Sequence, residues 1–506
     1  MRRIKKAAVL GSGVMGSGIA CHFANIGLEV LMLDIVPFDL SEEEKKDPAQ
    51  RNRIVNGALK ASLKSKPAPL YNKSFAGRIT TGNFDDDFEK IADADWIIEV
   101  VVERLDIKKQ VFEKVDQYRK KGSLVTSNTS GIPIHMMLEG RSEDFKKHFC
   151  GTHFFNPPRY LRLFEIIPSP ETDPAVIDFF KHYGEVYLGK QSVLAKDTPA
   201  FIGNRIGVYS IGKLMQLTPK HGLSIGTADK LTGVTIGRPK TGTFRLGDLV
   251  GHDTSAKVIQ GIKDNCPNDE QAASFIVPDY LQFLLDNKFY GNKSGQGFYK
   301  KTKEKDANGR PVILALNLET KEYEQQERVS LKSLKVSKQI EDLNKRIPSL
   351  IKEEDEGGKY LAEYFAGLFA YASNRIPEIS DDIYNIDNAM KAGYAWELGP
   401  FEYWQAIGVE EGIALAEAHG EKVADWVKEM VSAGNTSFYK AEGGERKYYD
   451  IPAKAYLTIP GTEGAIHLDT YRDKAPVMQN EEVILHDIGD GVLCFEMRTK
   501  MNTIGE

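Results

Sequence analysis

The first apolar stretches of the chain are short, and a glycine-rich turn separates them. Residues 4–10 (IKKAAVL) and 29–34 (EVLMLD) have the apolar runs of buried strands. Between them, GSGVMGSG at 11–18 leads into a segment whose apolar residues follow helical spacing as far as Gly27. A strand, a glycine turn, a helix and a second strand in this order predict a βαβ unit, and its crossover implies a parallel sheet.

The same alternation continues to the KDTP segment at 196–199. Short strand-like runs read RITTG (78–82), DWIIEVVVE (95–103), GSLVTSNTS (122–130), CGTHFF (150–155) and FEIIP (164–168). Runs of this kind between helical segments are typical of a doubly wound parallel sheet. We therefore predict a Rossmann-like α/β domain over residues 1–198.

Beyond residue 198 the apolar residues follow helical spacing, as in FIGNRIGVYSIGKLMQL at 201–217. We expect a first all-α domain over 199–300, a polar connection with one hairpin over 301–340, and a second all-α domain over 341–480. Residues 481–506 have the pattern of two strands around Gly-Asp-Gly, with no helix to cover them. Because a lone hairpin is marginally stable, we interpret this stretch as the start of a further, incomplete domain.

Two segments of the helical half resemble each other, at 225–251 and 383–408. With a single gap, Asp229 aligns with Asp387 and Gly242 with Gly399, and the stretches after the glycines match in length. Chance similarity between two helical segments is the alternative. The aligned Asp, Gly, Phe and Gly favour a duplication.

Composition narrows the class of protein. The 506 residues are 41% hydrophobic and 27% charged, which is ordinary for a globular protein, and the net charge of −6 argues against binding to nucleic acid or an anionic membrane. The four cysteines are scattered without metal-ligand spacing, so we expect no metal and a reducing compartment. No signal peptide or bilayer-length apolar segment is present in the sequence, and we expect a cytoplasmic location without membrane insertion.

The glycine-rich turn has the spacing of a dinucleotide site. Gly11 allows the tight turn, Gly13 lets the backbone approach a pyrophosphate, and Gly16 lets the helix pack on the strand. Val14 and Met15 lie at the helix N-terminus, where N–H groups and the helix dipole favour phosphate. The alternative is a glycine turn with no ligand.

The acidic residue after the next strand indicates which dinucleotide binds. Asp34 ends that strand, where a carboxylate accepts hydrogen bonds from both ribose hydroxyls and repels a 2′-phosphate. Residue 35 is isoleucine and not arginine. The sequence therefore favours NAD over NADP as the cofactor.

Two polar residues interrupt apolar strands, His153 in GTHFF and Glu165 in LFEII. Each one alone is more often a satisfied core residue. If the two strands leave the sheet side by side, the carboxylate would orient the imidazole and stabilise its charged form. Such a histidine takes a proton from an alcohol while hydride leaves the same carbon.

With these motifs in order, residues 4–300 resemble the NAD-dependent L-3-hydroxyacyl-CoA dehydrogenase family. The resemblance rests on GSGVMGSGIA, EVVVERLDIKK (99–109), SNTSGIPI (127–134), HFFNPP (153–158), the LFEII glutamate, KDTPAFIGNR (196–205) and KSGQGFY (293–299). It implies NAD-dependent oxidation of (S)-3-hydroxyacyl-CoA to 3-oxoacyl-CoA in fatty-acid β-oxidation. The alternatives are a dehydrogenase of free β-hydroxy acids and a non-catalytic NAD-binding scaffold.

The resemblance implies a role for each matching residue. His153 is similar to the family's catalytic base and Glu165 to its orienting partner, while Ser130 and Asn204 are similar to the residues that bind the substrate oxygens. The positions that line the nicotinamide half of the site are Asn128, Glu103 and Lys108. The alternatives are ordinary turn residues at 128 and 130, a solvent-facing asparagine at 204, and a surface ion pair between 103 and 108.

The charged segment 41–66 corresponds to the family's helical excursion that receives coenzyme A. Lys60, Lys64 and Lys66 would then meet phosphates of an acyl-CoA substrate, although a charged helix face is usually only solvated. KSKPAPLYNKS (64–74) departs from the family pattern.

The second helical copy lacks the KDTP lead-in, so we interpret it as structural. In single-copy relatives this domain pairs two subunits. We expect a monomer in which the two copies form an internal pseudo-dimer, or a homodimer.

Residues 481–506 resemble the opening strands of a crotonase-type enoyl-CoA hydratase, and we expect no hydratase activity from the 506 residues alone.

Overall fold

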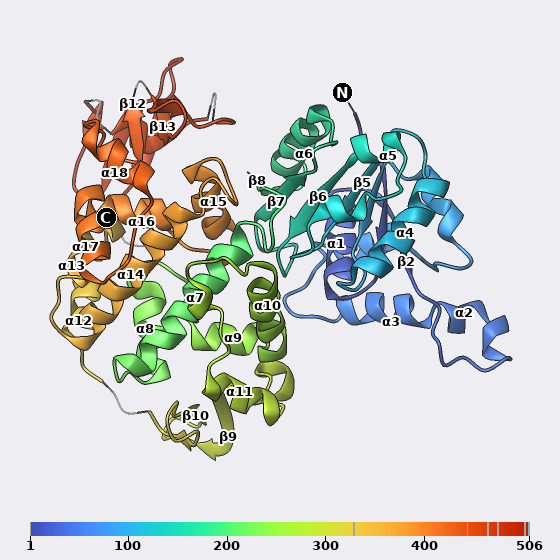
Figure 1. The fold of residues 1–506 in the computed structure, drawn as a ribbon, viewed down its shortest axis with the longest axis horizontal. Coiled ribbons are helices and arrows are strands. Elements are labelled where there is room, and N and C mark those ends of the chain that lie inside the picture. The colour runs from blue at the N-terminus through green and yellow to red at the C-terminus, as the bar shows by residue number, and fades with distance from the viewer. Residues whose placement is uncertain are drawn as a thin grey trace.

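The computed structural model describes residues 2–326, 329–442, 444–462, 465–472, 475–499 and 502–503. The N-terminal part is built on an eight-stranded sheet with the strand order β3-β2-β1-β4-β5-β6-β7-β8 (Figure 1). Its strands are β1 (Lys6–Leu10), β2 (Glu29–Asp34), β3 (Ile79–Asn83), β4 (Trp96–Glu99), β5 (Leu124–Ser127), β6 (Phe149–Phe154), β7 (Leu163–Pro168) and β8 (Gln191–Leu194).

Strands β1 to β6 are parallel, but β7 pairs with β6 in the antiparallel direction and β8 follows β7. The fold class is confirmed, and the expectation of parallel strands throughout is wrong for β7 and β8. Only residues 155–162 join β6 to β7. A parallel pairing needs a crossover of about a dozen residues or more, so this short connection imposes a hairpin.

Helices cover both faces of the sheet. Apolar residues of α1 and α6, such as Phe23 and Phe180, pack with Trp96 into one core. The core on the opposite face continues without a break into the helical half of the chain. Apart from those in the charged segment after β2, the helices of this domain are α1 (Val14–Asn25), α4 (Leu105–Tyr118), α5 (Glu143–Lys147) and α6 (Pro174–Val186).

The charged segment after β2 forms helices that project from the sheet domain (Figure 1). The helical spacing predicted over 41–66 becomes α2 (Pro48–Arg51) and α3 (Arg53–Ser62), with a short 3-10 turn before them. Val55 is the buried residue of α3, so most of this helix faces solvent.

The helical half begins with α7, which contacts helices of both copies of the repeat. Its first copy contains α7 (Gly203–Lys220), α8 (Ile225–Thr232), α9 (Phe244–Val250), α10 (His252–Asn265) and α11 (Asp279–Asp286). The second copy and the helices that lead into it are α12 (Lys332–Gln339), α13 (Leu343–Leu350), α14 (Glu356–Asn374), α15 (Ile383–Tyr394), α16 (Pro400–Ile407), α17 (Val409–Ala418) and α18 (Asp425–Ser432).

A small antiparallel sheet follows the helices of each copy, which the expectation of purely helical domains does not include. The first is β9 (Tyr299–Lys305), β10 (Pro311–Leu316) and β11 (Tyr323–Glu324), and it contains the hairpin predicted in the connection. The second is β12 (Tyr439–Glu442), β13 (Glu445–Asp450) and β14 (Ala455–Thr458). The final strands are β15 (Met478–Gln479), β16 (Val483–Asp487) and β17 (Leu493–Met497), and β16 and β17 form the antiparallel pair predicted around Gly-Asp-Gly.

The two aligned aspartates occupy matching settings. Asp229 accepts hydrogen bonds from the Phe244 amide at 2.6 Å and the Tyr299 hydroxyl at 2.6 Å. Asp387 accepts from the Phe401 amide at 2.9 Å and the Tyr439 hydroxyl at 2.6 Å. These equivalent contacts support the duplication.

The aligned glycines are required by the same aspartates. A Cβ at Gly242 would lie 2.5 Å from the Asp229 Cα, and a Cβ at Gly399 would lie 2.4 Å from the Asp387 Cα. Each copy therefore closes its helices through an Asp–Gly contact that excludes any side chain at the glycine.

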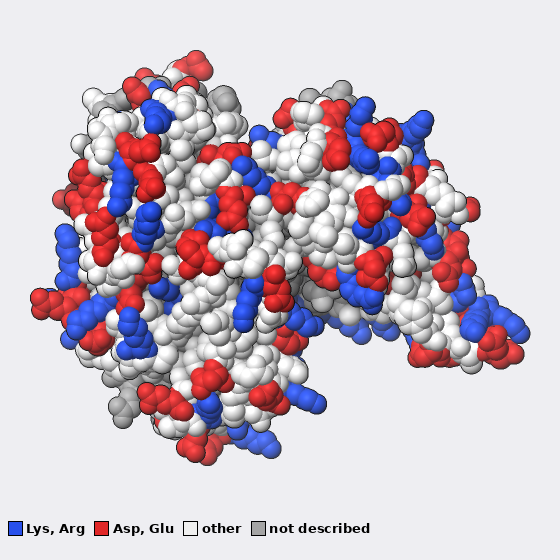
Figure 2. Space-filling model, viewed as in Figure 1, with Lys and Arg blue, Asp and Glu red and all other residues white. Residues whose placement is uncertain are grey.

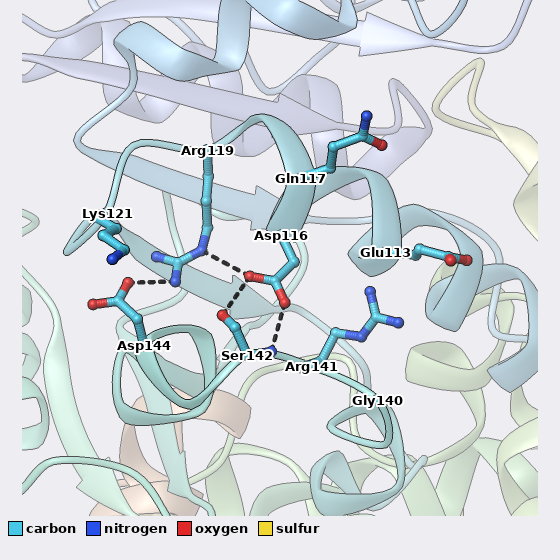
Figure 3. Close-up of a pocket in the computed structure, with 9 residues that line it drawn as sticks. All are labelled: Glu113, Asp116, Gln117, Arg119, Lys121, Gly140, Arg141, Ser142 and Asp144. Atoms are coloured by element: carbon cyan, nitrogen blue, oxygen red, sulfur yellow. Dashed lines mark hydrogen bonds and ion pairs between the residues drawn. The ribbon is translucent and has the colours of Figure 1, made fainter.

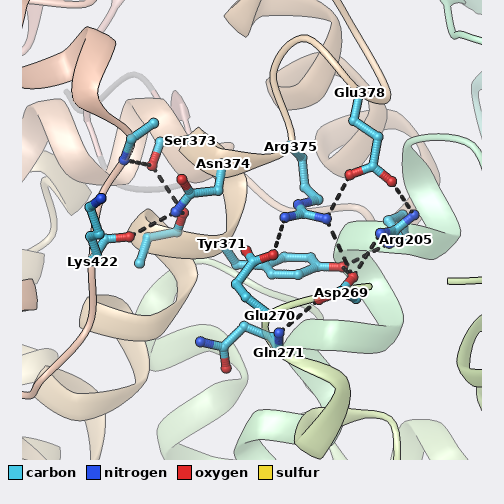
Figure 4. Close-up of polar contacts among 12 residues, drawn as sticks. Arg205, Asp269, Glu270, Gln271, Tyr371, Ser373, Asn374, Arg375, Glu378 and Lys422 are labelled. Atoms are coloured by element: carbon cyan, nitrogen blue, oxygen red, sulfur yellow. Dashed lines mark hydrogen bonds and ion pairs between the residues drawn. The ribbon is translucent and has the colours of Figure 1, made fainter. Parts of the chain in front are cut away.

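Buried charged groups join the two copies (Figure 4). Asp269 of the first copy is fully buried and accepts from Arg205 at 2.7 Å and from the Tyr371 hydroxyl at 2.9 Å. Arg375 lies 3.4 Å from the same carboxylate and 2.6 Å from Glu378. The interface between the copies therefore contains an ion-pair network inside an apolar surround.

On the face of the molecule shown in Figure 2, positive and negative side chains are interspersed. Within the described residues, no helix combines the length and the apolar character that crossing a membrane requires. The same residues contain no cluster of histidine, cysteine and acidic side chains that could hold a metal ion.

Candidate active site

The antiparallel pairing of β6 with β7 places His153 directly opposite Glu165. The His153 Nδ1 and Glu165 Oε2 atoms are 2.6 Å apart, and the two residues are 6% and 0% exposed. Because a carboxylate only accepts hydrogen bonds, Nδ1 carries the proton of this bond. The predicted contact is therefore present, and it joins neighbouring residues of a hairpin.

Glu165 is also held by the start of α7. Its Oε1 atom accepts hydrogen bonds from the amides of Ile202 at 3.1 Å and Gly203 at 2.8 Å. The turn before α7 is tight, with Ala200 and Phe201 at positive φ. The dipole of the 18-residue helix adds to these bonds, since an anion is stabilised at a helix N-terminus.

The Nε2 atom of His153 is available for a reactant. The ring lies between Phe155 and Phe201, with centroid distances of 4.7 and 5.8 Å. Among the residues that the structure describes, none forms a hydrogen bond to Nε2. An imidazole with Nδ1 bonded to a carboxylate and Nε2 unengaged is arranged to accept a proton at Nε2.

The SNTS turn after β5 is tied to the same site. Asn128 Oδ1 accepts a hydrogen bond at 2.9 Å from the amide of Phe154, the residue next to His153. Glu103 Oε1 accepts from the Thr129 hydroxyl at 2.5 Å and from the Ser130 amide at 3.0 Å. The carboxyl ends of β4, β5 and β6 therefore converge, as expected for a ligand site of an open α/β sheet.

The pair of Glu103 and Lys108 is half-buried, because the Glu103 side chain is 42% exposed while that of Lys108 is buried. Lys108 is 1% exposed, and its ammonium lies 3.2 Å from Glu103 and 2.8 Å from Glu99. Burial alone would lower the pKa of Lys108, but the carboxylates of Glu99 and Glu103 raise it above its ordinary value. At Glu103, burial alone would raise the pKa. Lys108 and the hydrogen bonds to Glu103 outweigh burial and lower this pKa below its ordinary value.

Glu99 belongs to this group but was not among the predicted site residues. Its side chain is fully buried and also accepts a hydrogen bond from the Ser127 hydroxyl at 2.5 Å. The sequence does contain a signal for Glu99, which is the lone acid at the end of the apolar run DWIIE. A buried acid requires partners, so such a position indicates a polar cluster.

The glycine turn has the shape that a dinucleotide needs. A Cβ at Gly16 would lie 1.9 Å from the Gly11 oxygen, whereas the Cβ position of Gly13 is open. The N–H groups of Val14 and Met15 lie in the first turn of α1, where no helical carbonyl is available to them. These residues fit the pyrophosphate of a dinucleotide at the open side of Gly13.

Asp34 lies beside this turn at the end of β2. Its Oδ2 atom accepts hydrogen bonds from the amide and the hydroxyl of Ser12, at 2.7 and 2.5 Å. Its Oδ1 accepts from the Ile35 amide at 2.7 Å. The carboxylate is thus fixed beside the glycine turn, where it could accept hydrogen bonds from the ribose of a bound dinucleotide.

Asn204 occupies the first turn of α7 and is partly buried. Its Oδ1 atom lies 3.4 Å from the hydroxyl of Tyr394, which belongs to the second helical copy. The neighbouring residue Gly203 donates its amide to Glu165. Asn204 therefore lies on the same helix turn that anchors the His153–Glu165 pair.

The three predicted coenzyme A lysines are exposed. Lys60 lies on α3, and Lys64 and Lys66 follow it. No hydrogen bond or ion pair joins their ammonium groups to another described residue. The structure therefore leaves them accessible but does not bring them into contact with His153.

A separate hollow of about 530 Å³ lies among the ends of α4 and α5 (Figure 3). Arg119 crosses it to Asp144 at 2.5 Å, and Asp116 accepts from Ser142 at 2.7 Å. It lies near the C-terminus of α4, whereas the site residues follow the carboxyl ends of the strands. The hollow thus shares no residue with the site around His153.

Comparisons with known proteins agree with this geometry. Residues 6–198 match the family model "3-hydroxyacyl-CoA dehydrogenase, NAD binding domain", and residues 201–301 match "3-hydroxyacyl-CoA dehydrogenase, C-terminal domain". A "Probable 3-hydroxyacyl-CoA dehydrogenase" of Bacillus subtilis is 45% identical over the whole chain, which spans 64% of that protein's length. A Deinococcus radiodurans protein of the same name is 44% identical over 61% of the chain and 86% of its own length.

The solved structure of 3-hydroxybutyryl-CoA dehydrogenase from Escherichia coli K12 has the same fold. It superposes with a TM-score of 0.60 over 86% of this chain and 100% of its own, at 20% identity. The match therefore extends well beyond the NAD-binding part and into the second helical copy.

Proposed function

Because the chain belongs to the 3-hydroxyacyl-CoA dehydrogenase family, we propose that it catalyses the reversible oxidation of (S)-3-hydroxyacyl-CoA to 3-oxoacyl-CoA, with NAD, in fatty-acid β-oxidation. The observation that carries the proposal is the 2.6 Å contact between His153 Nδ1 and Glu165, with Nε2 unengaged. This arrangement is what the removal of a hydroxyl proton requires.

In the proposed mechanism, His153 Nε2 takes the proton of the substrate hydroxyl as the carbon is oxidised. NAD, when bound, supplies the hydride acceptor. Glu165 holds the imidazole in the tautomer with Nδ1 protonated and stabilises the positive charge that forms on the ring. The amides of Ile202 and Gly203 keep the Glu165 carboxylate in place while the ring changes charge.

The remaining site residues bind and orient in this proposal. Ser130 and Asn204 donate hydrogen bonds to substrate oxygens, and Asn128, Glu103 and Lys108 shape the side of the site that faces the nicotinamide. Glu99 supports them by pairing with Lys108. Orientation of this kind contributes to rate because the reactants are held close to the geometry of reaction.

Coenzyme A recognition is assigned to the projecting helical segment. Lys60 and Lys64 are exposed there and carry the positive charge that phosphates require. Arg159 lies close by, since it donates hydrogen bonds to the carbonyls of Ala68 and Leu70 at 2.6 and 2.8 Å. The acyl-CoA is therefore proposed to lie between this segment and the loop after β6.

We also propose a division of the chain into domains. The NAD-binding domain is 1–198, the first helical domain 199–300, the connection 301–340 and the degenerate second copy 341–480. Residues 481–506 are proposed as the start of a crotonase-like domain. The two helical copies are proposed to form an internal pseudo-dimer.

A cytoplasmic location is also proposed. The four unpaired cysteines support it, because disulfides are rare in reducing compartments.

The proposal is tested by following NADH absorbance with the purified 506-residue chain. We expect rapid NADH oxidation with acetoacetyl-CoA and none above background with free acetoacetate. Turnover of the free acid at a similar rate would instead identify a β-hydroxy-acid dehydrogenase. NADH binding without turnover of either compound would identify a scaffold protein and overturn the proposal.

A further inference from the structure

The second helical copy reaches the site through α15. This helix contacts β7, β8 and α7. The carbonyl of Ala392 accepts a hydrogen bond from the Arg162 amide at 3.1 Å, and Asn385 Oδ1 accepts from the Leu194 amide at 3.2 Å. The copy is therefore fixed to the strand that carries Glu165 and to the strand beside it.

Tyr394, the last residue of α15, lies against the same turn of α7 that carries Asn204. A Cβ at Gly207 would lie 2.1 Å from the Tyr394 Cζ atom, so the ring occupies the space of a missing side chain. A Cβ at Gly203 would similarly lie 2.7 Å from the Phe155 ring. Gly203 and Gly207 lie one turn apart on the same face of α7, and together they admit the rings of Phe155 and Tyr394 beside Asn204.

Tyr394 is also connected to the ring system around His153. Its centroid lies 6.1 Å from that of Phe155, which packs on His153 at 4.7 Å. Burial, and then the nearby Glu165 carboxylate, raise the pKa of the Tyr394 hydroxyl, so the phenol is neutral and can donate. The tyrosine thus reaches the surroundings of both His153 and Asn204.

The residues after Tyr394 hold it in place from the other side. Ala395 adopts a left-handed conformation with φ of 53°, which ends α15 sharply. The next residue, Trp396, is buried under the guanidinium of Arg238 at 3.5 Å. Tyr394 is therefore fixed between α15 and an anchor on the first copy.

We infer that Tyr394 is a positioning residue: its hydroxyl donates to Asn204 Oδ1 and turns the amide Nδ2 toward the substrate oxygen. The O···O separation of 3.4 Å is long for a hydrogen bond, and the packing against Gly207 fixes the ring in the position from which the bond is made. The second copy thereby completes the substrate site of the first and is more than a structural support. This inference rests on the proposed function, because Tyr394 is inferred to act through the binding of substrate by Asn204.

The test uses acetoacetyl-CoA reduction by NADH with the full chain and the variant Tyr394→Phe, which keeps the ring and removes the hydroxyl. We expect kcat/KM for acetoacetyl-CoA to fall roughly three- to ten-fold, the effect of one lost hydrogen bond, with an unchanged dissociation constant for NADH. Tyr456→Phe is the control, because its hydroxyl donates to the Ser437 carbonyl at 2.6 Å within the small sheet of the second copy. We expect it to retain wild-type kinetics.

A double variant separates positioning from a general structural effect. If Tyr394 acts through Asn204, Tyr394→Phe has no further effect on kcat/KM in an Asn204→Ala background. Wild-type kcat/KM for Tyr394→Phe, or full multiplication of the two effects in the double variant, would overturn the inference. Absence of turnover by the wild-type chain would instead overturn the proposed function, and the inference with it.

Discussion

At the scale of single residues, the site depends on polar groups that are held by more than one partner. Glu165 has three donors, and Asp34 is fixed by the backbone and hydroxyl of Ser12. Fixed groups of this kind lose little entropy on binding, so their orientation contributes directly to recognition. In the proposed function, the choice of cofactor and the chemistry therefore rest on side chains that do not need to rearrange.

The first prediction concerns the cofactor. In Asp34→Ala the ribose hydroxyls lose their acceptor and a 2′-phosphate loses its repulsion, so we expect weaker NADH binding and a smaller preference for NADH over NADPH. One lost charged hydrogen bond corresponds to about 1.5–3 kcal/mol, or at least a ten-fold change in the ratio of kcat/KM values. Steady-state kinetics with both cofactors measure it, and an unchanged ratio would show that Asp34 does not contact the ribose.

At the scale of elements, the hairpin of β6 and β7 brings the acid and the base together. His153 and Glu165, each a polar residue in an apolar strand, suggest a contact if the two strands are neighbours, and the glycine spacing indicates the dinucleotide turn, because both features are local in the sequence. The short connection before β7 and the lone acid in DWIIE are also local signals, the first for an antiparallel pair and the second for a buried acid, whereas the approach of Tyr394 depends on long-range packing. A single sequence carries no local pattern for such contacts.

The loop between β6 and β7 is held by a buried lysine. Lys190 is 4% exposed and donates to the carbonyls of Pro158 and Leu161, the latter at 2.6 Å. Burial, and secondarily the charge of Arg162, lower its pKa from 10.5 to about 8. Between pH 8 and pH 10.5, Lys190 is therefore protonated in the unfolded chain but has lost its proton in the folded chain.

This shift predicts how stability depends on pH. Below pH 8 the folded protein carries a poorly solvated charge, and from there toward pH 10.5 that penalty disappears, so the free energy of unfolding should increase. The increase is about 3 kcal/mol relative to Lys190→Met, which has no proton to release. Urea denaturation of both proteins across this range measures the difference. Parallel pH dependence of the two proteins would contradict the shifted pKa.

At the scale of the whole molecule, the two helical copies behave as one unit. Their apolar cores are continuous, and the ion-pair network around Asp269 crosses between them (Figure 4). The repeat was visible in the sequence through Asp229 and Asp387, but the network was not, because its members come from distant segments. The continuous core explains why the second copy can contribute a residue to the site.

The network supplies a prediction of stability. Asp269→Ala leaves the guanidinium groups of Arg205 and Arg375 without their shared carboxylate, and removing one partner of a buried ion pair costs about 3–5 kcal/mol. We expect a decrease of about 3 kcal/mol in the free energy of unfolding, because Glu378 still pairs with both arginines. Asp264→Ala, on the exposed side of α10, is the control and should unfold like the wild type.

The central claim is that His153 is the base of the reaction, and the kcat of His153→Gln measures it most directly. With acetoacetyl-CoA and NADH we expect kcat to fall roughly 10²–10⁴-fold, the usual contribution of a general acid or base, while the dissociation constant for NADH stays unchanged. An intact NADH site with that loss of turnover would assign the proton transfer to His153. A kcat within about two-fold of the wild type, far below the expected contribution, would contradict the account.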